Sequence, residues 1–85
     1  MRFPTVHLNG TSKKELIEQY DKAIYDLNQA IQSLMAAAPH RRDYYPQGDF
    51  AFSEASQQFR AQVTSLCGVR DELVKIYEHL HGLER

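Results

Sequence analysis

The feature that most constrains the fold is a heptad repeat of apolar residues in the first half of the chain. The apolar positions recur at alternating spacings of three and four, in the order Ile17, Tyr20, Ile24, Leu27, Ile31, Leu34 and Ala38. This spacing gives an α-helix one apolar face and is typical of a helix that packs against another helix. Ser12 and Glu15 have the spacing of a capping box, and Pro39 stops a helix at the preceding residue. The sequence therefore predicts a helix over residues 12–38.

The second half of the chain carries a matching repeat. Its apolar seam, interrupted by one glutamine, is Phe52, Ala55, Phe59, Gln62, Leu66, Val69, Leu73, Ile76, Leu80 and Leu83. This helix is expected to start between Asp49 and Ser53, which are both good N-caps, and to end near His81 with Gly82 as its C-cap. With a second helix over residues 50–82, the fold class is all-α: a long antiparallel helical hairpin that forms a single domain, residues 1–85.

Both predicted helices have more apolar surface than one partner can cover. The first has a flanking row formed by Leu16, Ala23, Ala30 and Ala37. The second has an additional stripe formed by Val63, Cys67, Arg70, Val74, Tyr77 and His81. Because a chain of 85 residues has only a marginal core on its own, we expect self-association. The simplest form is a dimer that makes a four-helix bundle, and a higher homo-oligomer satisfies the same pattern.

The net charge and the cysteine content limit the functions and the cellular compartment that we expect for this chain. The formal net charge is −1, whereas a general nucleic-acid-binding surface needs a large basic excess. Cys67 is the single cysteine, so the chain cannot form an internal disulfide, and we expect it in the reducing cytoplasm. No apolar run has the length of a signal peptide or of a membrane span, so we expect no membrane partner.

The most informative polar stretch is the connection between the helices, residues 39–49. Its two prolines and its glycine prevent continuous helix. Arginine holds phosphates or carboxylates through paired hydrogen bonds, tyrosine rings stack on planar groups, and a glutamine amide can read a polar edge. The candidate ligand-binding residues are therefore Arg41, Arg42, Tyr44, Tyr45 and Gln47. The structural alternative is that the arginines offset the dipole of the first helix while the tyrosines cover the end of the bundle.

Two lysines form a second candidate for ligand binding. Lys13 and Lys14 lie in the first turn of the first helix, where the helix dipole favours acidic side chains. They are placed to attract an anion held by the helix N-terminus. Alternatively, Glu15 and Glu18 offset their charge, and both lysines are simply solvated. In a hairpin this pair lies at the opposite end from the connection, so only a neighbouring copy could bring the two basic clusters together.

No arrangement in the sequence predicts catalysis. There is no Ser-His-Asp order, no phosphate-binding glycine loop and no carboxylate pair. His79 and His81 are two residues apart and point in different directions on a helix, so they do not form a metal site. Cys67 lies on an apolar stripe and is expected to be a small buried side chain. We therefore predict a protein that is not an enzyme and that has no metal or cofactor.

Two polar motifs carry a resemblance to a known class of proteins. They are His7-Leu8-Asn9-Gly10-Thr11-Ser12 and Arg42-Asp43-Tyr44-Tyr45-Pro46-Gln47-Gly48. With the helices beside them, they resemble short bacteriophage and prophage helical proteins, most of them uncharacterised. By analogy of size and architecture, the resemblance implies an anti-defence protein in the host cytoplasm. Some such small oligomers sequester cyclic or ADP-ribose-type nucleotide signals.

Two functions are therefore expected of the connection. The first is non-catalytic binding of a small, anionic, nucleotide-like ligand, which fits the arginines and tyrosines in a chain of near-neutral charge. The alternative is a protein-interaction or inhibitor module that contacts a host or phage protein, such as a host defence protein, through the same residues. Tyrosine and arginine are also enriched at protein interfaces, so composition alone does not separate the two.

Overall fold

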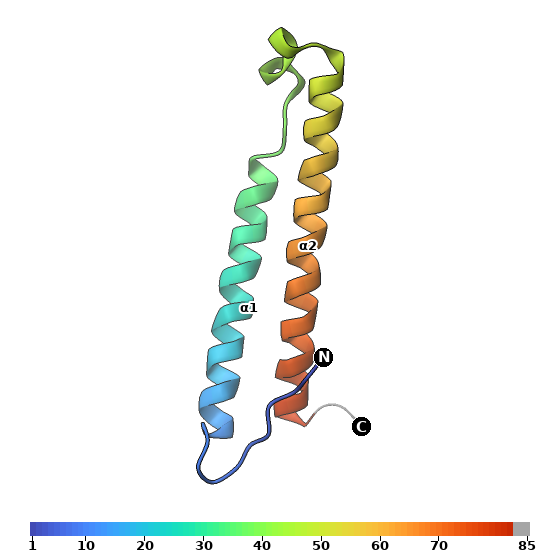
Figure 1. Ribbon diagram of the computed structural model, residues 1–85. Helices are drawn as coiled ribbons and strands as arrows, with labels where there is room; N and C mark the ends of the chain where they lie inside the picture. The colour runs from blue at the N-terminus through green and yellow to red at the C-terminus, as the bar shows by residue number, and fades with distance from the viewer. Residues whose placement is uncertain (83–85) are drawn as a thin grey trace.

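The chain folds into two long antiparallel helices in a computed structural model that describes residues 1–82. Helix α1 spans Lys13–Ala36 and helix α2 spans Asp49–His81, and they lie side by side along their length (Figure 1). Two single-turn 3₁₀ helices, η1 (Arg41–Asp43) and η2 (Tyr45–Gln47), form the connection. The molecule is a rod with extents of 60 × 21 × 20 Å. The predicted all-α helical hairpin is confirmed. Neither helix in residues 1–82 combines the length and the apolar character needed to cross a membrane.

Helix α1 begins as the sequence predicts and ends slightly earlier. The hydroxyl of Ser12 accepts a hydrogen bond from the Glu15 amide at 3.1 Å, which caps the first turn. The regular helix ends at Ala36, two residues before the predicted end at about residue 38, because the chain tightens there. The amides of Ala37 and Ala38 donate to carbonyls three residues earlier, at Leu34 and Met35. This 3₁₀-type closure satisfies the last carbonyls before the chain reaches Pro39.

The cap of α1 gives a direct test of this boundary. We expect Ser12→Ala to lower the free energy of unfolding by about 1 kcal/mol, because an amide of the first turn loses its acceptor. For a chain of this size, that change corresponds to a drop of about 4–8 °C in melting temperature. Thr11→Ala, which removes a neighbouring exposed hydroxyl, is the matched control. Equal melting temperatures for the two variants would contradict the assigned cap.

Helix α2 begins at a glycine instead of at a polar cap. The helix starts at Asp49, within the predicted window from Asp49 to Ser53. Neither of these residues is its cap, because the capping position is Gly48, which makes no side-chain hydrogen bond. Gly48 has a φ of 96°, a conformation that other residues rarely adopt, and this turns the chain from η2 into the helix. At the other end, Gly82 adopts a left-handed conformation and its amide bonds back to Glu78 and His79, which confirms the predicted C-terminal cap.

The contact between the helices is apolar but thin. Its buried side chains are Ile31 of α1 and Ile76 and Leu80 of α2, and most other seam residues are only half-buried. The packing face of α2 is rotated from the predicted seam, since Val69 is 46% exposed whereas its neighbour Arg70 is half-buried. The rotated face includes the predicted second stripe at Val63, Arg70 and Tyr77, all half-buried. The last predicted seam position, Leu83, lies outside the described residues.

Residues 1–11, here called the lead-in, fold back along the end of the hairpin. The Asn9-Gly10 pair forms a turn in which the Gly10 amide donates to the His7 carbonyl at 3.1 Å. The segment then lies against the C-terminal end of α2 (Figure 1). The ring of Phe3 stacks on His79 with 4.7 Å between the centroids. The lead-in therefore covers the last turn of α2, where Leu80 is buried.

Candidate functional site

The connection is an ordered turn structure. The amide of Arg42 donates to Nδ1 of His40 at 3.2 Å, and the Asp43 amide donates to the His40 carbonyl at 3.0 Å. These bonds form η1, and the Gln47 amide donates to the Tyr44 carbonyl at 3.0 Å to form η2. Because its backbone is bonded to itself, the connection presents its side chains from a defined scaffold.

Phe52, in the first turns of α2, packs against two side chains of the connection. The guanidinium of Arg41 lies 4.7 Å from the centroid of the Phe52 ring, in a cation–π contact. The ring of Tyr44 lies 6.3 Å from the same ring at a tilt of 55°. Arg41 and Tyr44 thus contribute to the packing of the hairpin end.

Three other predicted site residues point into solvent. Tyr45 is 70% exposed, and Arg42 and Gln47 are also exposed. Beside them Phe50 is 89% exposed, although it is a large aromatic residue. Sequence reasoning missed Phe50, and the available signal was its place just outside the apolar seam. Tyr45 and Phe50 give this end of the molecule an exposed aromatic surface.

Some of the predicted residues meet in a cleft that is too small for a nucleotide. Its lining residues are Arg41, Tyr44, Tyr45, Gly48, Asp49 and Phe52. Its volume is about 30 Å³, comparable to the space that one water molecule occupies, whereas sites for drug-sized ligands are about 300–1,000 Å³. The carboxylate of Asp49 also makes the cleft less favourable for an anion. Gln47 lines a neighbouring shallow groove with Tyr44, and Arg42 lines neither of these two hollows.

The two lysines lie at the far end of the rod. The start of α1 and the connection are at opposite ends of the hairpin (Figure 1). Lys13 lines a groove with Pro4, Thr5, Val6, His79 and Leu80. Lys14 is exposed. One chain therefore does not bring Lys13 or Lys14 to Arg41 and Arg42.

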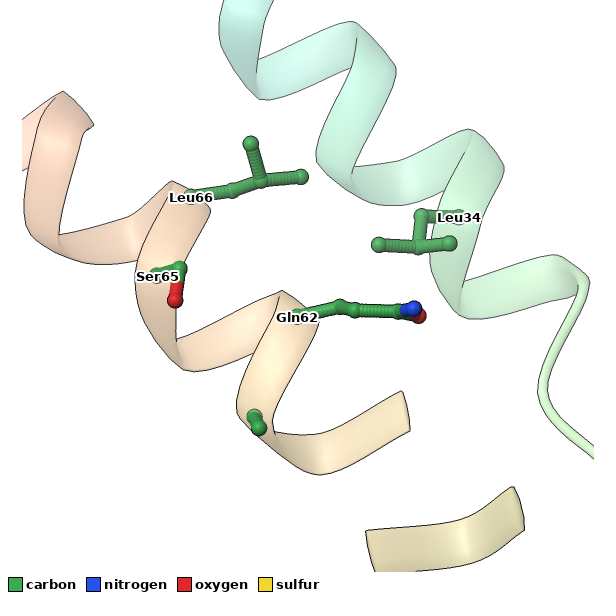
Figure 2. A pocket seen from close by; sticks show the side chains of 5 residues that line it. Leu34, Gln62, Ser65 and Leu66 are labelled. Carbon is green, nitrogen blue, oxygen red and sulfur yellow. The ribbon is translucent and has the colours of Figure 1, made fainter. Parts of the chain in front are cut away.

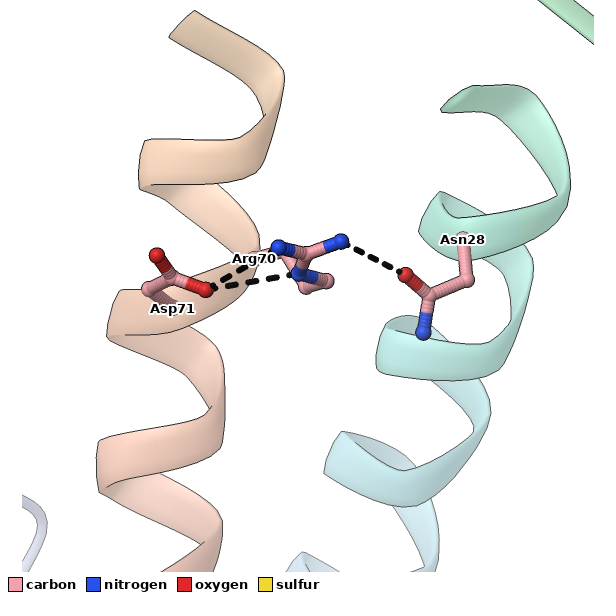
Figure 3. Close-up of polar contacts among 3 residues, drawn as sticks. All are labelled: Asn28, Arg70 and Asp71. Carbon is pink, nitrogen blue, oxygen red and sulfur yellow. Dashed lines mark hydrogen bonds and ion pairs between the residues drawn. The ribbon is translucent and has the colours of Figure 1, made fainter. Parts of the chain in front are cut away.

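A polar bridge crosses the hairpin near its middle. The guanidinium of Arg70 donates to the side-chain oxygen of Asn28 on α1 at 3.3 Å and pairs with Asp71 at 3.3 Å (Figure 3). Arg70 has no role assigned by the sequence, and its half-buried stem takes the place of an apolar seam residue. The bridge favours one register of the two helices, because sliding either helix would break the bond to Asn28.

No three His, Cys, Asp or Glu side chains of residues 1–82 gather where they could hold a metal ion. No protein-family model, curated protein or solved structure matches this chain significantly. The resemblance to phage proteins stays a prediction, and a function has to be argued from the surface itself.

Proposed function

We propose that this chain is a non-catalytic binding module whose working surface is the connection, and that its ligand is a protein. The observation that carries the proposal is the exposure of two aromatic rings near this end of the chain, Tyr45 at 70% and Phe50 at 89%, together with the exposure of Arg42 in the same connection. Tyrosine and arginine are among the residues enriched at the energetic centres of protein interfaces, and large aromatic side chains are enriched there too. The cleft that Tyr45 lines has a volume of only about 30 Å³, which fits contact with a protein surface better than enclosure of a small molecule.

The scaffold under this surface supports the same function. The connection is held by its own backbone hydrogen bonds and by the contacts of Arg41 and Tyr44 with Phe52. Side chains on an ordered scaffold lose less entropy on binding than those on a flexible loop. In a phage context, which the sequence motifs favour, the partner would be a host defence protein in the cytoplasm, and the chain would act as its inhibitor.

A second candidate is the binding of a small nucleotide-like anion, such as a cyclic or ADP-ribose-type signal. Its support is the exposure of Arg42 and Tyr45, three residues apart in the connection, since a guanidinium can pair with a phosphate and a tyrosine ring can stack on a base. A single chain offers one wall of such a site. A homo-oligomer would supply the other wall if a neighbouring copy placed its Lys13 and Lys14 beside the connection.

The test uses Arg42→Ala and Tyr45→Ala, each checked for unchanged helical circular dichroism. Tagged protein is used to capture partners from a bacterial host lysate, and the affinity of each purified partner is then measured. We expect each variant to weaken binding about 5–150-fold, because a charged or stacking contact is worth about 1–3 kcal/mol. Arg60→Ala, an exposed arginine of α2 outside the connection, is the matched control.

A parallel melting experiment separates the two candidates. Cyclic nucleotides and ADP-ribose are added one at a time to the parent protein. A nucleotide at 100 times its dissociation constant raises the free energy of unfolding by about 2.7 kcal/mol. A rise with the parent that Arg42→Ala abolishes would favour the nucleotide site. Partner binding that both variants and the control share would show that the connection is only a structural cover.

A further inference from the structure

The hairpin exposes far more surface than a compact chain of its size. Its accessible surface is 6655 Å², whereas a compact monomer of 9.8 kDa exposes about 5,200 Å². Its radius of gyration is 18.4 Å, against about 12 Å for a globular chain of this length. The excess of about 1,500 Å² exceeds the ~800 Å² that each partner contributes to a standard protein interface. The area of the rod is therefore sufficient for a stable interface with a second copy.

One face of the rod has the shape that such an interface needs. An open groove runs between the helices on this face (Figure 2), lined by Leu34, Ala61, Gln62, Ser65 and Leu66. Ala30 lies one turn before Leu34, so it extends the same side of α1. Ala30, Ala61 and Ser65 are small and exposed, which lets another backbone approach closely.

A protruding side chain stands next to the groove. Val69 lies one turn beyond Ser65 and Leu66 on α2, so it belongs to the same side of the helix. It is 46% exposed, although it is apolar and lies in the middle of a helix. The polar bridge from Arg70 to Asn28 is on the other flank, because Asn28 is six residues from Leu34, or about 120° around α1.

We propose that this face binds a second copy of the chain in an antiparallel, two-fold dimer. A two-fold axis perpendicular to the helices, placed between the groove and Val69, brings Val69 of each copy into the groove of the other. Such an interface is self-complementary, as two-fold symmetry requires. It completes a four-helix bundle and covers Leu34, Leu66 and Val69. This proposed dimer has a defined interface and an antiparallel orientation of its two copies, neither of which depends on what the connection binds.

The first test changes the protruding residue. Val69→Asp buries one charge in each of the two grooves, so we expect the dissociation constant of the dimer to rise about 100-fold or more. The parent should have twice the 9.8 kDa monomer mass by light scattering at micromolar concentration. Thr64→Asp, which places the same charge at an exposed position away from the groove, should keep the parent mass. Circular dichroism should be equal in both variants, because Val69 lies at the edge of the helix contact in a single chain.

The second test determines whether the two copies lie antiparallel or parallel. Cysteine is placed at one position per chain in a Cys67→Ser background, and pairs of variants are mixed and oxidised. Ala37 and Ala61 lie at the connection side of the groove, and Glu72 lies beyond Val69, about 16 Å from Ala61 along α2. In the antiparallel dimer Ala37→Cys faces Glu72→Cys of the second copy, whereas in a parallel dimer it faces Ala61→Cys. Because a disulfide requires Cα atoms within about 7 Å, only one mixture should cross-link efficiently.

Each outcome of these two tests either supports or overturns the proposed dimer. A dimer that is weakened by Val69→Asp and cross-linked through the mixture of Ala37→Cys and Glu72→Cys supports it. A parent that stays monomeric overturns it, as does an assembly that Val69→Asp leaves intact. Preferential cross-linking of Ala37→Cys with Ala61→Cys overturns the antiparallel order. Failure of the connection variants to affect partner binding would leave all of these results unchanged, so the two proposals fail separately.

Discussion

Ile31→Asp is expected to abolish the fold. Ile31 is the buried residue of α1, with 8% of its surface exposed, and it lies at the middle of the heptad repeat. A carboxylate there is taken out of water, whereas Arg70, the cation that reaches across the hairpin, is already bonded to Asn28 and Asp71. An unpaired buried charge costs several kcal/mol. Small domains have only about 5–15 kcal/mol of stability in total, and a chain with a thin core lies near the lower limit. Circular dichroism at 25 °C should show the loss of most helical signal.

The matched control is Gln32→Asp, which introduces the same residue at the next position of the same helix. Gln32 is exposed, so its carboxylate stays in water and the effect is limited to a lower helix propensity, within about 0.5–1 kcal/mol. A folded Ile31→Asp variant with the melting temperature of the parent would show that the seam of α1 is wrongly assigned. Equal unfolding of both variants would mean that the helix does not tolerate Asp anywhere near its centre.

The heptad repeat predicted the two helices because their packing is decided by local, periodic features. The same holds for their caps at Ser12 and Gly82, where one side chain or one glycine determines the turn. The errors arose where the structure depends on contacts between distant residues. The rotation of α2 brings Arg70 toward α1, and this depends on Asn28, a residue that no periodic pattern selects. Gly48 replaced a polar cap because the path of the whole connection requires a positive φ.

The sequence predicts where the connection lies in the hairpin, but not which of its side chains pack against α2. The residues of the connection identify it as the polar end of the hairpin, and it lies there. The ring of Phe52 decides which residues of the connection pack against α2, because it contacts Arg41 and Tyr44. That contact distinguishes Arg41 and Tyr44, of which Arg41 is itself exposed, from Arg42, Tyr45 and Gln47. The sequence assigned Phe52 to the helix seam, so its second role at the connection was not evident.

The antiparallel order of two copies also bears on the nucleotide candidate. In that order the connection of one copy lies toward the lead-in end of the other, which carries Lys13 and Lys14. A parallel order places like ends together and keeps these lysines away from Arg42. Nucleotide binding at the connection would then depend on assembly, so Val69→Asp would weaken it together with the dimer. A protein ligand that touches only the aromatic surface of one copy would bind both forms equally.

Leu80→Ala is the second substitution with a large expected effect. Leu80 is the most buried residue of the core, with 3% of its surface exposed, and it lines the groove where the lead-in crosses the end of α2. Removing its side chain leaves a cavity and loses apolar burial, for which leucine-to-alanine changes in cores cost about 2–5 kcal/mol. In a chain of this size the melting temperature should fall by at least about 10 °C. Leu8→Ala makes the same change at a leucine that is 98% exposed, so its effect should stay within about 0.5 kcal/mol. If the two variants have the same melting temperature, the lead-in and the last turn of α2 do not form the packed end described for them. If Leu80→Ala alone melts early, the thin seam and the folded-back lead-in jointly stabilise that end of the hairpin.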